Sequence, residues 1–300
     1  MKVMTVNGPI DPSELGITMT HEHTISDLRH WGYDGVLDDI PLAIEELLAY
    51  KKVGGASIVD VTNACMGRDA KSLREISKAT DLHIITATGY YTEPYYPLEV
   101  YELGTNALAD VMIKELTVGI DNTDIKAGII GEIGTIRDYI KPAEERVFRA
   151  AARAHLQTTV PITTHTYLDQ LVHDQLDILQ EEGVDLTKVI IGHLGDKRDI
   201  EFLLSVAKRG PFVQIDHVGL EDRQRDHARS LLVKQLLEAG HLNQVLISMD
   251  VCFKSRLHWF GGTGYDHLIT SFLPQLKQQG ISDSNIQTML VDNPAQAIGF

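Results

Sequence analysis

The stretch GITMTHEH, residues 16–23, decides the fold. It is the first apolar, β-branched run of the chain, and it ends in two histidines, His21 and His23, that flank one glutamate. A doubly wound open sheet usually carries a glycine-rich phosphate loop after its first strand, and this chain has T-H-E-H there. Side chains two residues apart point to the same face of a strand, so both imidazoles aim at one point. This spacing suits a metal site, although H-x-H alone is a weak motif.

Seven further apolar, β-rich runs follow, and segments with helical periodicity lie between them. The helical segments include 38–54, 142–159 and 168–184, and the first has a predicted N-cap at Asp38. Strand and helix alternating eight times is the pattern of an α/β fold, the (β/α)8 or TIM barrel. Because no Pro-, Ser- or Gly-rich linker divides the chain, we expect a single domain over residues 1–300. The predicted strands are 16–23, 56–63, 83–89, 127–134, 160–166, 188–195, 212–218 and 243–250.

The bulk properties narrow the function classes. Of the 300 residues, 43% are hydrophobic and 23% are charged, which is a globular composition. The formal net charge of −15 repels nucleic-acid phosphates, so we expect no nucleic-acid partner. The two cysteines, Cys65 and Cys252, are too few for a disulfide framework and fit a reducing cytoplasm. No signal-peptide core is found, and no run reaches the ~18 apolar residues of a membrane span. We therefore expect a cytoplasmic protein without a membrane partner.

Ligand-type side chains interrupt five of the predicted strands near their C-terminal ends. A barrel brings these ends to one face, where catalytic residues gather. A lone buried histidine is more often a hydrogen-bonded core residue than a ligand, but six such side chains buried without compensation would be costly. A metal centre removes that cost, so the set predicts one. Its members are His21 and His23 on the first strand, Glu132 on the fourth, His165 on the fifth, His193 on the sixth and Asp250 on the eighth.

The motifs around these residues resemble the phosphotriesterase family of the amidohydrolase superfamily. THEH, GEIG, TTHT, IGHLGD and SMD occur in the family's order and on the matching strands, and the resemblance runs from about Gly8 to Pro294. It implies a binuclear centre, usually of zinc. Many members bridge the two metals with a carboxylated lysine on strand four, where this chain has Glu132. Lys126 stands at the start of that strand and hence at the wrong end of the barrel. The chain therefore resembles the branch called phosphotriesterase homology proteins.

The resemblance also implies a division of the ligands. His21, His23 and Asp250 would hold the more buried metal, and His165 and His193 the more exposed one. Glu132 and a hydroxide would bridge the two. Histidine and carboxylate ligands also accept manganese, cobalt or iron, so the sequence does not fix the metal.

The family's mechanism implies four further roles. The bridging hydroxide would attack a carbonyl or phosphoryl centre, and Asp250 would accept its proton or act as a simple ligand. His217 would pass that proton outward in a relay of Asp250, His217 and Asp196, with Asp196 orienting the imidazole, or it would line the barrel mouth without a role. Tyr91 matches a position where related lactonases place an aromatic residue directed at the substrate carbonyl, with Tyr90 as the neighbouring alternative.

The loops after the predicted strands suggest the substrate. Lys254, Arg256 and Arg223 place cations on the catalytic face of an acidic chain, beside the aromatic Trp259, which favours an anionic small molecule. The alternative interpretation is that these cations are ordinary solvated loop charges without a role in binding. We expect an ester hydrolase acting on a lactone, with a phosphorylated or carboxylated sugar lactone as the best fit. The alternatives are a phosphoester or phosphotriester hydrolase and a metal-binding protein without turnover. Similar proteins are often homodimers, and the sequence shows no interface signature.

Overall fold

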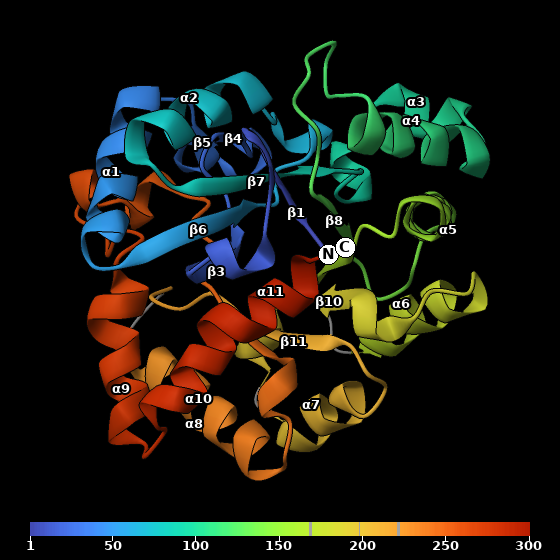
Figure 1. Ribbon diagram of the computed structural model, residues 1–300. Coiled ribbons are helices and arrows are strands. Elements are labelled where there is room, and N and C mark those ends of the chain that lie inside the picture. The colour runs from blue at the N-terminus through green and yellow to red at the C-terminus, as the bar shows by residue number, and fades with distance from the viewer. Residues whose placement is uncertain (168–169, 198, 221–222) are drawn as a thin grey trace.

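The computed structural model describes residues 1–167, 170–197, 199–220 and 223–300, and its centre is an eight-stranded parallel sheet (Figure 1). The strands follow one another around the sheet in chain order, and every neighbouring pair is parallel. The amide of Asp250 donates to the carbonyl of His21 at 3.1 Å, which brings the ends of the first and last strands together. The predicted (β/α)8 barrel and all eight of its strands are confirmed. These are β3 (Ile17–Glu22), β6 (Gly55–Asp60), β7 (His83–Thr88), β8 (Ile129–Thr135), β9 (Ile162–Thr166), β10 (Val189–Ile191), β11 (Phe212–Ile215) and β12 (Val245–Ile247).

Helices surround the barrel on its outer face (Figure 1). The predicted N-cap Asp38 is wrong by one residue, because the side chain of Asp39 accepts from the amide of Leu42 at 3.0 Å. Among the described helices, none has the length and apolar character that a bilayer span needs. The helices are α1 (Ile40–Lys52), α2 (Ala70–Thr80), α3 (Leu98–Glu102), α4 (Thr105–Thr117), α5 (Pro142–Thr158), α6 (Gln170–Glu181), α7 (Ile200–Ala207), α8 (Arg223–Glu238), α9 (Leu273–Gln278), α10 (Asp283–Gln287) and α11 (Asn293–Ile298).

Alternating strand residues divide the core into two parts. Outward-facing residues such as Ile58, Ile84 and Ile191 pack against the helices in one continuous apolar cluster. Inward-facing residues such as Val59 and Ile85 fill the barrel itself. Because the interior is packed with side chains, a site that binds small molecules lies at an end of the barrel rather than inside it.

The two termini close the N-terminal end of the barrel. The antiparallel hairpin of β1 (Val3–Thr5) and β2 (Gly8–Ile10), which the sequence did not predict, contributes Val3 to the inner cluster, and α11 contributes Ala297 and Ile298. The backbones of Lys2 and Phe300 exchange two hydrogen bonds, and both termini lie near the barrel axis (Figure 1). The candidate functional site lies at the opposite end of the barrel, where the strands finish.

Candidate metal centre

The end of β3 places both of its histidines on the inside of the barrel. Pairing with β6 is irregular between Met19 and Glu22, so the strand changes register just before the T-H-E-H segment ends. His21 and His23 are buried, and their Nε2 atoms lie 3.9 Å and 3.2 Å from Oδ1 of Asp250. The structure therefore brings the two imidazoles to one point, as their spacing predicts.

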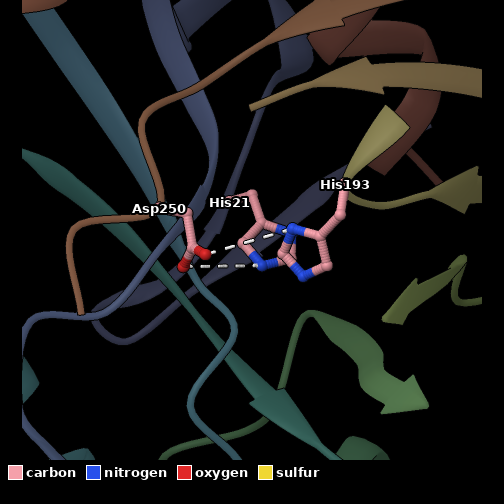
Figure 2. Close-up of side chains that lie close together, drawn as sticks. All are labelled: His21, His193 and Asp250. Atoms are coloured by element: carbon pink, nitrogen blue, oxygen red, sulfur yellow. Dashed lines mark ion pairs between the residues drawn. The ribbon is translucent and has the colours of Figure 1, made fainter. Parts of the chain in front are cut away.

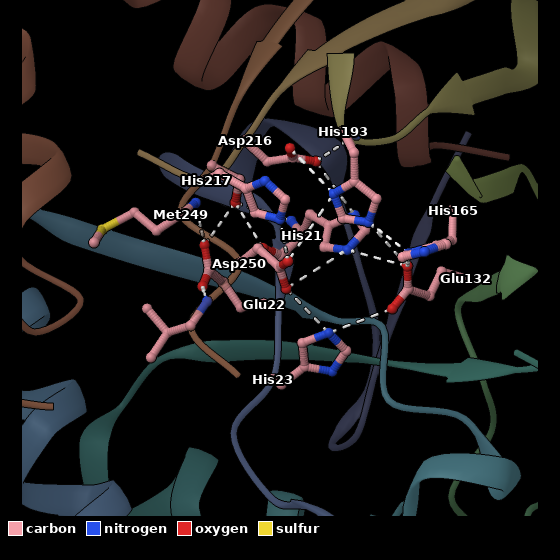
Figure 3. A network of polar contacts seen from close by, with 12 residues as sticks. His21, Glu22, His23, Glu132, His165, His193, Asp216, His217, Met249 and Asp250 are labelled. Carbon is pink, nitrogen blue, oxygen red and sulfur yellow. Dashed lines mark hydrogen bonds and ion pairs between the residues drawn. The ribbon is translucent and has the colours of Figure 1, made fainter. Parts of the chain in front are cut away.

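Glu22, between the two histidines, points away from them and joins β3 to the end of β12 (Figure 3). Its Oε1 accepts from the hydroxyl of Ser248 and from the amide of Met249, both at 2.7 Å, and its Oε2 accepts from the amide of Val251 at 2.9 Å. Asp250 lies between these two amides, so the buried Glu22 carboxylate fixes the backbone that carries Asp250. This role of Glu22 was not predicted from the sequence.

Replacing Glu22 by Gln should therefore disturb both stability and the site. The amide group cannot accept on both sides, and one buried backbone N–H of Met249 or Val251, just after β12, loses its acceptor, at about 1–3 kcal/mol. We expect a fall in Tm of several degrees and a lower kcat in Glu22→Gln, measured by calorimetry and substrate turnover. Glu75→Gln, on the exposed face of α2, is the control and should match the wild type. A Glu22→Gln protein with unchanged Tm and kcat would contradict this role.

Three site residues follow strand ends in the left-handed backbone region. His193, His217 and Asp250 have φ values of 60°, 59° and 51°. This conformation costs a non-glycine residue about 1–3 kcal/mol and persists only where the surrounding structure enforces it. The sharp turns after β10, β11 and β12 direct these side chains toward the barrel mouth. Glycine would adopt this backbone conformation more easily, but it has no side chain that could bind a metal.

Glu132 occupies the middle of the cluster. Ile130 and Ile133 both pack on the outer core, so the strand bulges at Gly131 and turns Glu132 inward. A side chain at Gly131 would lie 2.1 Å from the carbonyl of Thr163, so this turn requires glycine. The Glu132 carboxylate contacts all four histidines: Oε1 lies 3.4 Å from His23, and Oε2 lies 3.1 Å from His165, 3.4 Å from His193 and 3.5 Å from His21.

The donor atoms fit two metal ions. One group with ligand atoms within 4.8 Å of one another is His21, His23 and Glu132, and another is Glu132, His165 and His193, so Glu132 belongs to both. Asp250 joins His21 and His193 in a third group, whose side chains point toward one another (Figure 2). Nε2 of His21 and Oδ1 of Asp250 are buried without a hydrogen-bond partner, and such atoms are suited to bind cations.

The charges of the cluster favour a cation as well. Burial alone would raise the pKa of the Glu132 and Asp250 carboxyls, but the surrounding histidines lower both pKa values well below their usual range. Burial would likewise lower the pKa of His23, and the carboxylates of Asp250 and Glu132 instead raise it to about 10. The two carboxylates thus stay ionised, and a divalent cation can neutralise their charge in place of the histidine protons.

A second layer of polar groups orients the imidazoles. Asp216 lies beneath His193, with Oδ1 3.2 Å from its Nδ1 and Oδ2 accepting from its amide at 2.9 Å. The hydroxyl of Thr62 lies 2.8 Å from Nδ1 of His23. Such partners fix the tautomer and orientation of metal-binding histidines. Neither role was predicted from the sequence. The signal available for Asp216 was its carboxylate next to His217 in the strand segment QIDHV.

The three residues predicted to relay a proton contact one another in turn, and Figure 3 shows the His217 and Asp250 members of this chain. Nε2 of His217 lies 2.8 Å from Oδ2 of Asp250, and its Nδ1 lies 2.5 Å from Oδ2 of Asp196. Burial would lower the pKa of His217, but the two carboxylates raise it to about 9. Asp196 belongs to the turn Leu194–Asp196 after β10, and its side chain is 32% exposed, so this line of residues reaches solvent.

The two candidate tyrosines after β7 differ in direction. The phenolic oxygen of Tyr91 lies 3.3 Å from Nδ1 and 3.4 Å from Nε2 of His165, at the edge of the cluster. Tyr90 instead donates to Oε1 of Glu99 at 2.7 Å. Burial raises the pKa of Tyr91 well above 10, so its phenol stays protonated and can donate a hydrogen bond.

The predicted substrate residues lie in different settings. Lys254 is 31% exposed and lies 3.8 Å from the Asp38 carboxylate, while Trp259 is 69% exposed. Arg256 is buried, and its Nη2 donates to the carbonyls of Val218 and Met249, which joins the ends of β11 and β12. The side chain of Arg223 lies outside the described residues.

Comparison with known proteins gives whole-chain matches. A model of the phosphotriesterase family matches residues 1–298. The phosphotriesterase homology protein of Escherichia coli (strain K12) is 38% identical over 288 residues, covering 95% of this chain and 98% of that protein. The crystal structure of the E. coli protein complexed with phosphate in its active site has a TM-score of 0.92 at 38% identity, covering 96% of this chain and 99% of that chain.

Two further relatives have names that state an activity. The N-acetyltaurine hydrolase of Tetraodon nigroviridis is 33% identical over 348 residues, covering 100% of this chain and 98% of that protein. The crystal structure of a lactonase from Listeria monocytogenes has a TM-score of 0.94 at 28% identity, covering 100% of this chain and 99% of that chain. N-acetyltaurine is an amide and a lactone is a cyclic ester, so both relatives are hydrolases of acyl compounds.

Proposed function

Because this chain belongs to the phosphotriesterase family, we propose that it hydrolyses the ester bond of a lactone that carries an anionic group, such as a phosphorylated or carboxylated sugar lactone. The coarser assignment, a metal-dependent hydrolase, follows from the family and from the cluster of metal-type side chains at the barrel mouth. The choice of a lactone as the substrate depends on the side chain that would contact the carbonyl oxygen of the substrate.

Tyr91 is the observation that carries the ester proposal. Its phenol is a neutral donor beside His165, and a neutral donor suits a carbonyl oxygen that becomes negative only as the reaction proceeds. The wall on its side is apolar, because Leu28 and Met66 pack with Tyr91 in one small cluster. Such a wall suits the carbon skeleton of a ring better than it suits a charged phosphoryl group.

The chemistry divides between the metals and the chain. Two divalent cations, for which we expect zinc, would supply an activated water near neutral pH and polarise the acyl oxygen. Glu132 would hold both ions, with His21, His23 and Asp250 on one and His165 and His193 on the other. Asp250 would accept the proton of the attacking water, and His217 would pass that proton to Asp196 and so to solvent.

Tyr91→Phe should therefore slow lactone hydrolysis with little change in metal binding. One lost hydrogen bond to a developing oxyanion corresponds to about a 10²-fold fall in kcat. The kinetic constants and the metal content of the purified variant check this result. Tyr90→Phe, which removes a hydroxyl directed at Glu99, is the matched control. Equal losses in both variants would argue against a specific contact of Tyr91 with the substrate.

Lys254 would bind the anionic group of the substrate from the rim. We expect Lys254→Ala to raise KM for a phosphorylated lactone about tenfold, the value of one charge-assisted contact of about 1.4 kcal/mol. KM for the unphosphorylated lactone should stay unchanged, and Lys234→Ala, on the outer helix α8, should alter neither. Equal changes for both lactones in Lys254→Ala would remove this assignment.

Amide hydrolysis is the second candidate function. The relative named N-acetyltaurine hydrolase favours it, and so does His217, whose Nε2 lies 2.8 Å from Oδ2 of Asp250 and would return the proton of the attacking water to a leaving amine. An amine leaves only when it is protonated, so an amidase needs a general acid in this position. Ester hydrolysis depends less on a general acid at the position of His217.

A hydrolysis screen tests the proposed function. Zinc- or manganese-loaded protein would be assayed with sugar lactones, phosphorylated sugar lactones, N-acetylated amines, aryl esters and an aryl phosphotriester. We expect the best lactone to exceed the other classes in kcat/KM by about 100-fold, or about 2.7 kcal/mol of transition-state preference. A higher kcat/KM for an amide or a phosphoester would replace the ester proposal. A metal-loaded protein without any turnover would indicate a binding protein.

A further inference from the structure

The proposed proton relay of Asp250, His217 and Asp196 has a further buried partner. Oδ2 of Asp196 meets Nδ1 of His217 at 2.5 Å, and its other oxygen, Oδ1, accepts from Nη2 of Arg229 at 2.6 Å. Arg229 comes from α8 and is 1% exposed. One carboxylate therefore lies between the catalytic imidazole and a buried guanidinium.

Arg229 is itself anchored by the loop that follows β11. Its Nη1 donates to Oδ1 of Asp226 at 3.0 Å and to the carbonyl of Leu220 at 3.3 Å. Asp226 accepts in turn from the amide of Gly219 at 2.9 Å, and its Oδ2 lies 2.9 Å from Nε2 of His267. Asp226 alone would balance the charge of the guanidinium. The second carboxylate that contacts Arg229, that of Asp196, is the one that also contacts His217.

We infer that Arg229 is a positioning residue for the hydrolytic reaction, since it fixes the Asp196 carboxylate in the orientation that accepts from His217. Asp196 belongs to a short turn and is partly exposed, so water competes for its oxygens and its side chain would rotate without a second anchor. A guanidinium at a fixed angle holds one oxygen and leaves the other for the imidazole. The inference rests on the proposed function, because it assigns Arg229 to the same relay.

A groove next to Arg229 makes the inference testable by chemical rescue. It has a volume of about 460 Å³, and its lining includes Asp196, Arg229 and Lys234. When the side chain of Arg229 is truncated, guanidinium ions from solvent can enter through this groove and reach the space that the native group occupied. Lys234 lines the same groove from the same helix, and its amine lies 3.8 Å from Glu238, so it provides a matched control.

The experiment compares zinc-loaded wild type with Arg229→Ala, Arg229→Lys and Lys234→Ala. We expect Arg229→Ala to lower kcat between about 10- and 100-fold, the usual range for a residue that orients a catalytic group. Its KM should stay within about twofold of wild type, and its metal content should be unchanged. Guanidinium at about 20 mM should restore a large part of kcat in Arg229→Ala and should not accelerate Lys234→Ala. Wild-type kcat in both Arg229 variants would overturn the inference.

Two further measurements separate positioning from simple support of the fold. In an Asp196→Asn background, Arg229→Ala should cause little additional loss of kcat, because Arg229 acts through Asp196. An additional loss as large as in the wild-type background would overturn the inference. If Arg229→Ala does not fold because the buried carboxylate of Asp226 loses its partner, Arg229→Lys carries the same comparisons, since an ammonium cannot reproduce the planar fork.

The third measurement does not depend on activity. In ¹⁵N-histidine-labelled wild type, the short contact with Asp196 should give a downfield Nδ1 proton signal of His217, and this signal should disappear in Arg229→Ala and return with guanidinium. A signal that persists in Arg229→Ala without guanidinium would overturn the inference. If wild type hydrolyses none of the tested substrates, the proposed function has failed, and this signal still decides whether Arg229 orients Asp196.

Discussion

Asp250→Asn is expected to lower kcat/KM by about three orders of magnitude on any substrate that the wild type hydrolyses. The carboxamide keeps the shape of the side chain, but it cannot accept the proton of the attacking water. In the native site, Oδ2 of Asp250 lies 2.8 Å from Nε2 of His217 and Oδ1 lies 3.2 Å from Nε2 of His23, so each oxygen lies next to an imidazole. A carboxamide would have to present its NH2 group to one of these two imidazoles.

Metal analysis of the same Asp250→Asn samples distinguishes the two roles that the sequence leaves open. If two metal ions are retained while kcat falls, Asp250 is the proton acceptor. If the metal is lost together with activity, Asp250 is mainly a ligand. Asp124→Asn, at a side chain that is 83% exposed, is the control and should behave as wild type. Asp250→Asn with kcat/KM within tenfold of wild type would contradict both roles.

Glu132→Gln is expected to lower the metal content from two ions per chain to one or fewer and to lower kcat by about 10³-fold. The wild-type carboxylate spans the cluster, with Oε1 toward His23 and Oε2 toward His165 and His193. A neutral amide removes the anionic bridge, and the loss of several kcal/mol of transition-state stabilisation by the metals corresponds to this change in rate. Metal content by mass spectrometry and kcat on the best substrate measure the result.

The surface variant Glu75→Gln controls for the general effect of this substitution. A Glu132→Gln protein that retains two tightly bound metals and wild-type kcat would exclude Glu132 as the bridge. Reduced metal content with normal Tm would show that the effect is confined to the site.

The barrel and the ligand cluster could be predicted because each metal-type side chain ends or interrupts an apolar strand. A barrel gathers strand ends from distant parts of the chain, so the positions of His21, His165 and Asp250 in sequence were sufficient to place them together. The bulge that turns Glu132 inward depends on a glycine whose neighbour, Thr163, belongs to the next strand. That contact is visible only in three dimensions.

The supporting residues could not be predicted for the same reason. Glu22 reads as a polar residue between two ligands, and its partners lie more than 220 residues away in the chain. Arg229 lies on a helix whose sequence is rich in charges, and nothing in the sequence distinguishes it from its exposed neighbours. Arg256 reads as a loop cation, yet its guanidinium is buried against backbone carbonyls. Tertiary contacts, rather than local sequence, decide the role of each of these charges.

Anomalous diffraction from crystals of zinc-loaded protein would show whether the chain holds a two-metal centre bridged by Glu132. We expect two zinc peaks at the barrel mouth. One should lie at bonding distance, about 2.0–2.2 Å, from His21, His23 and Asp250, and the other from His165 and His193, with Glu132 bound to both. A single peak, or two peaks of which only one contacts Glu132, would rule out a binuclear centre with Glu132 as its bridge.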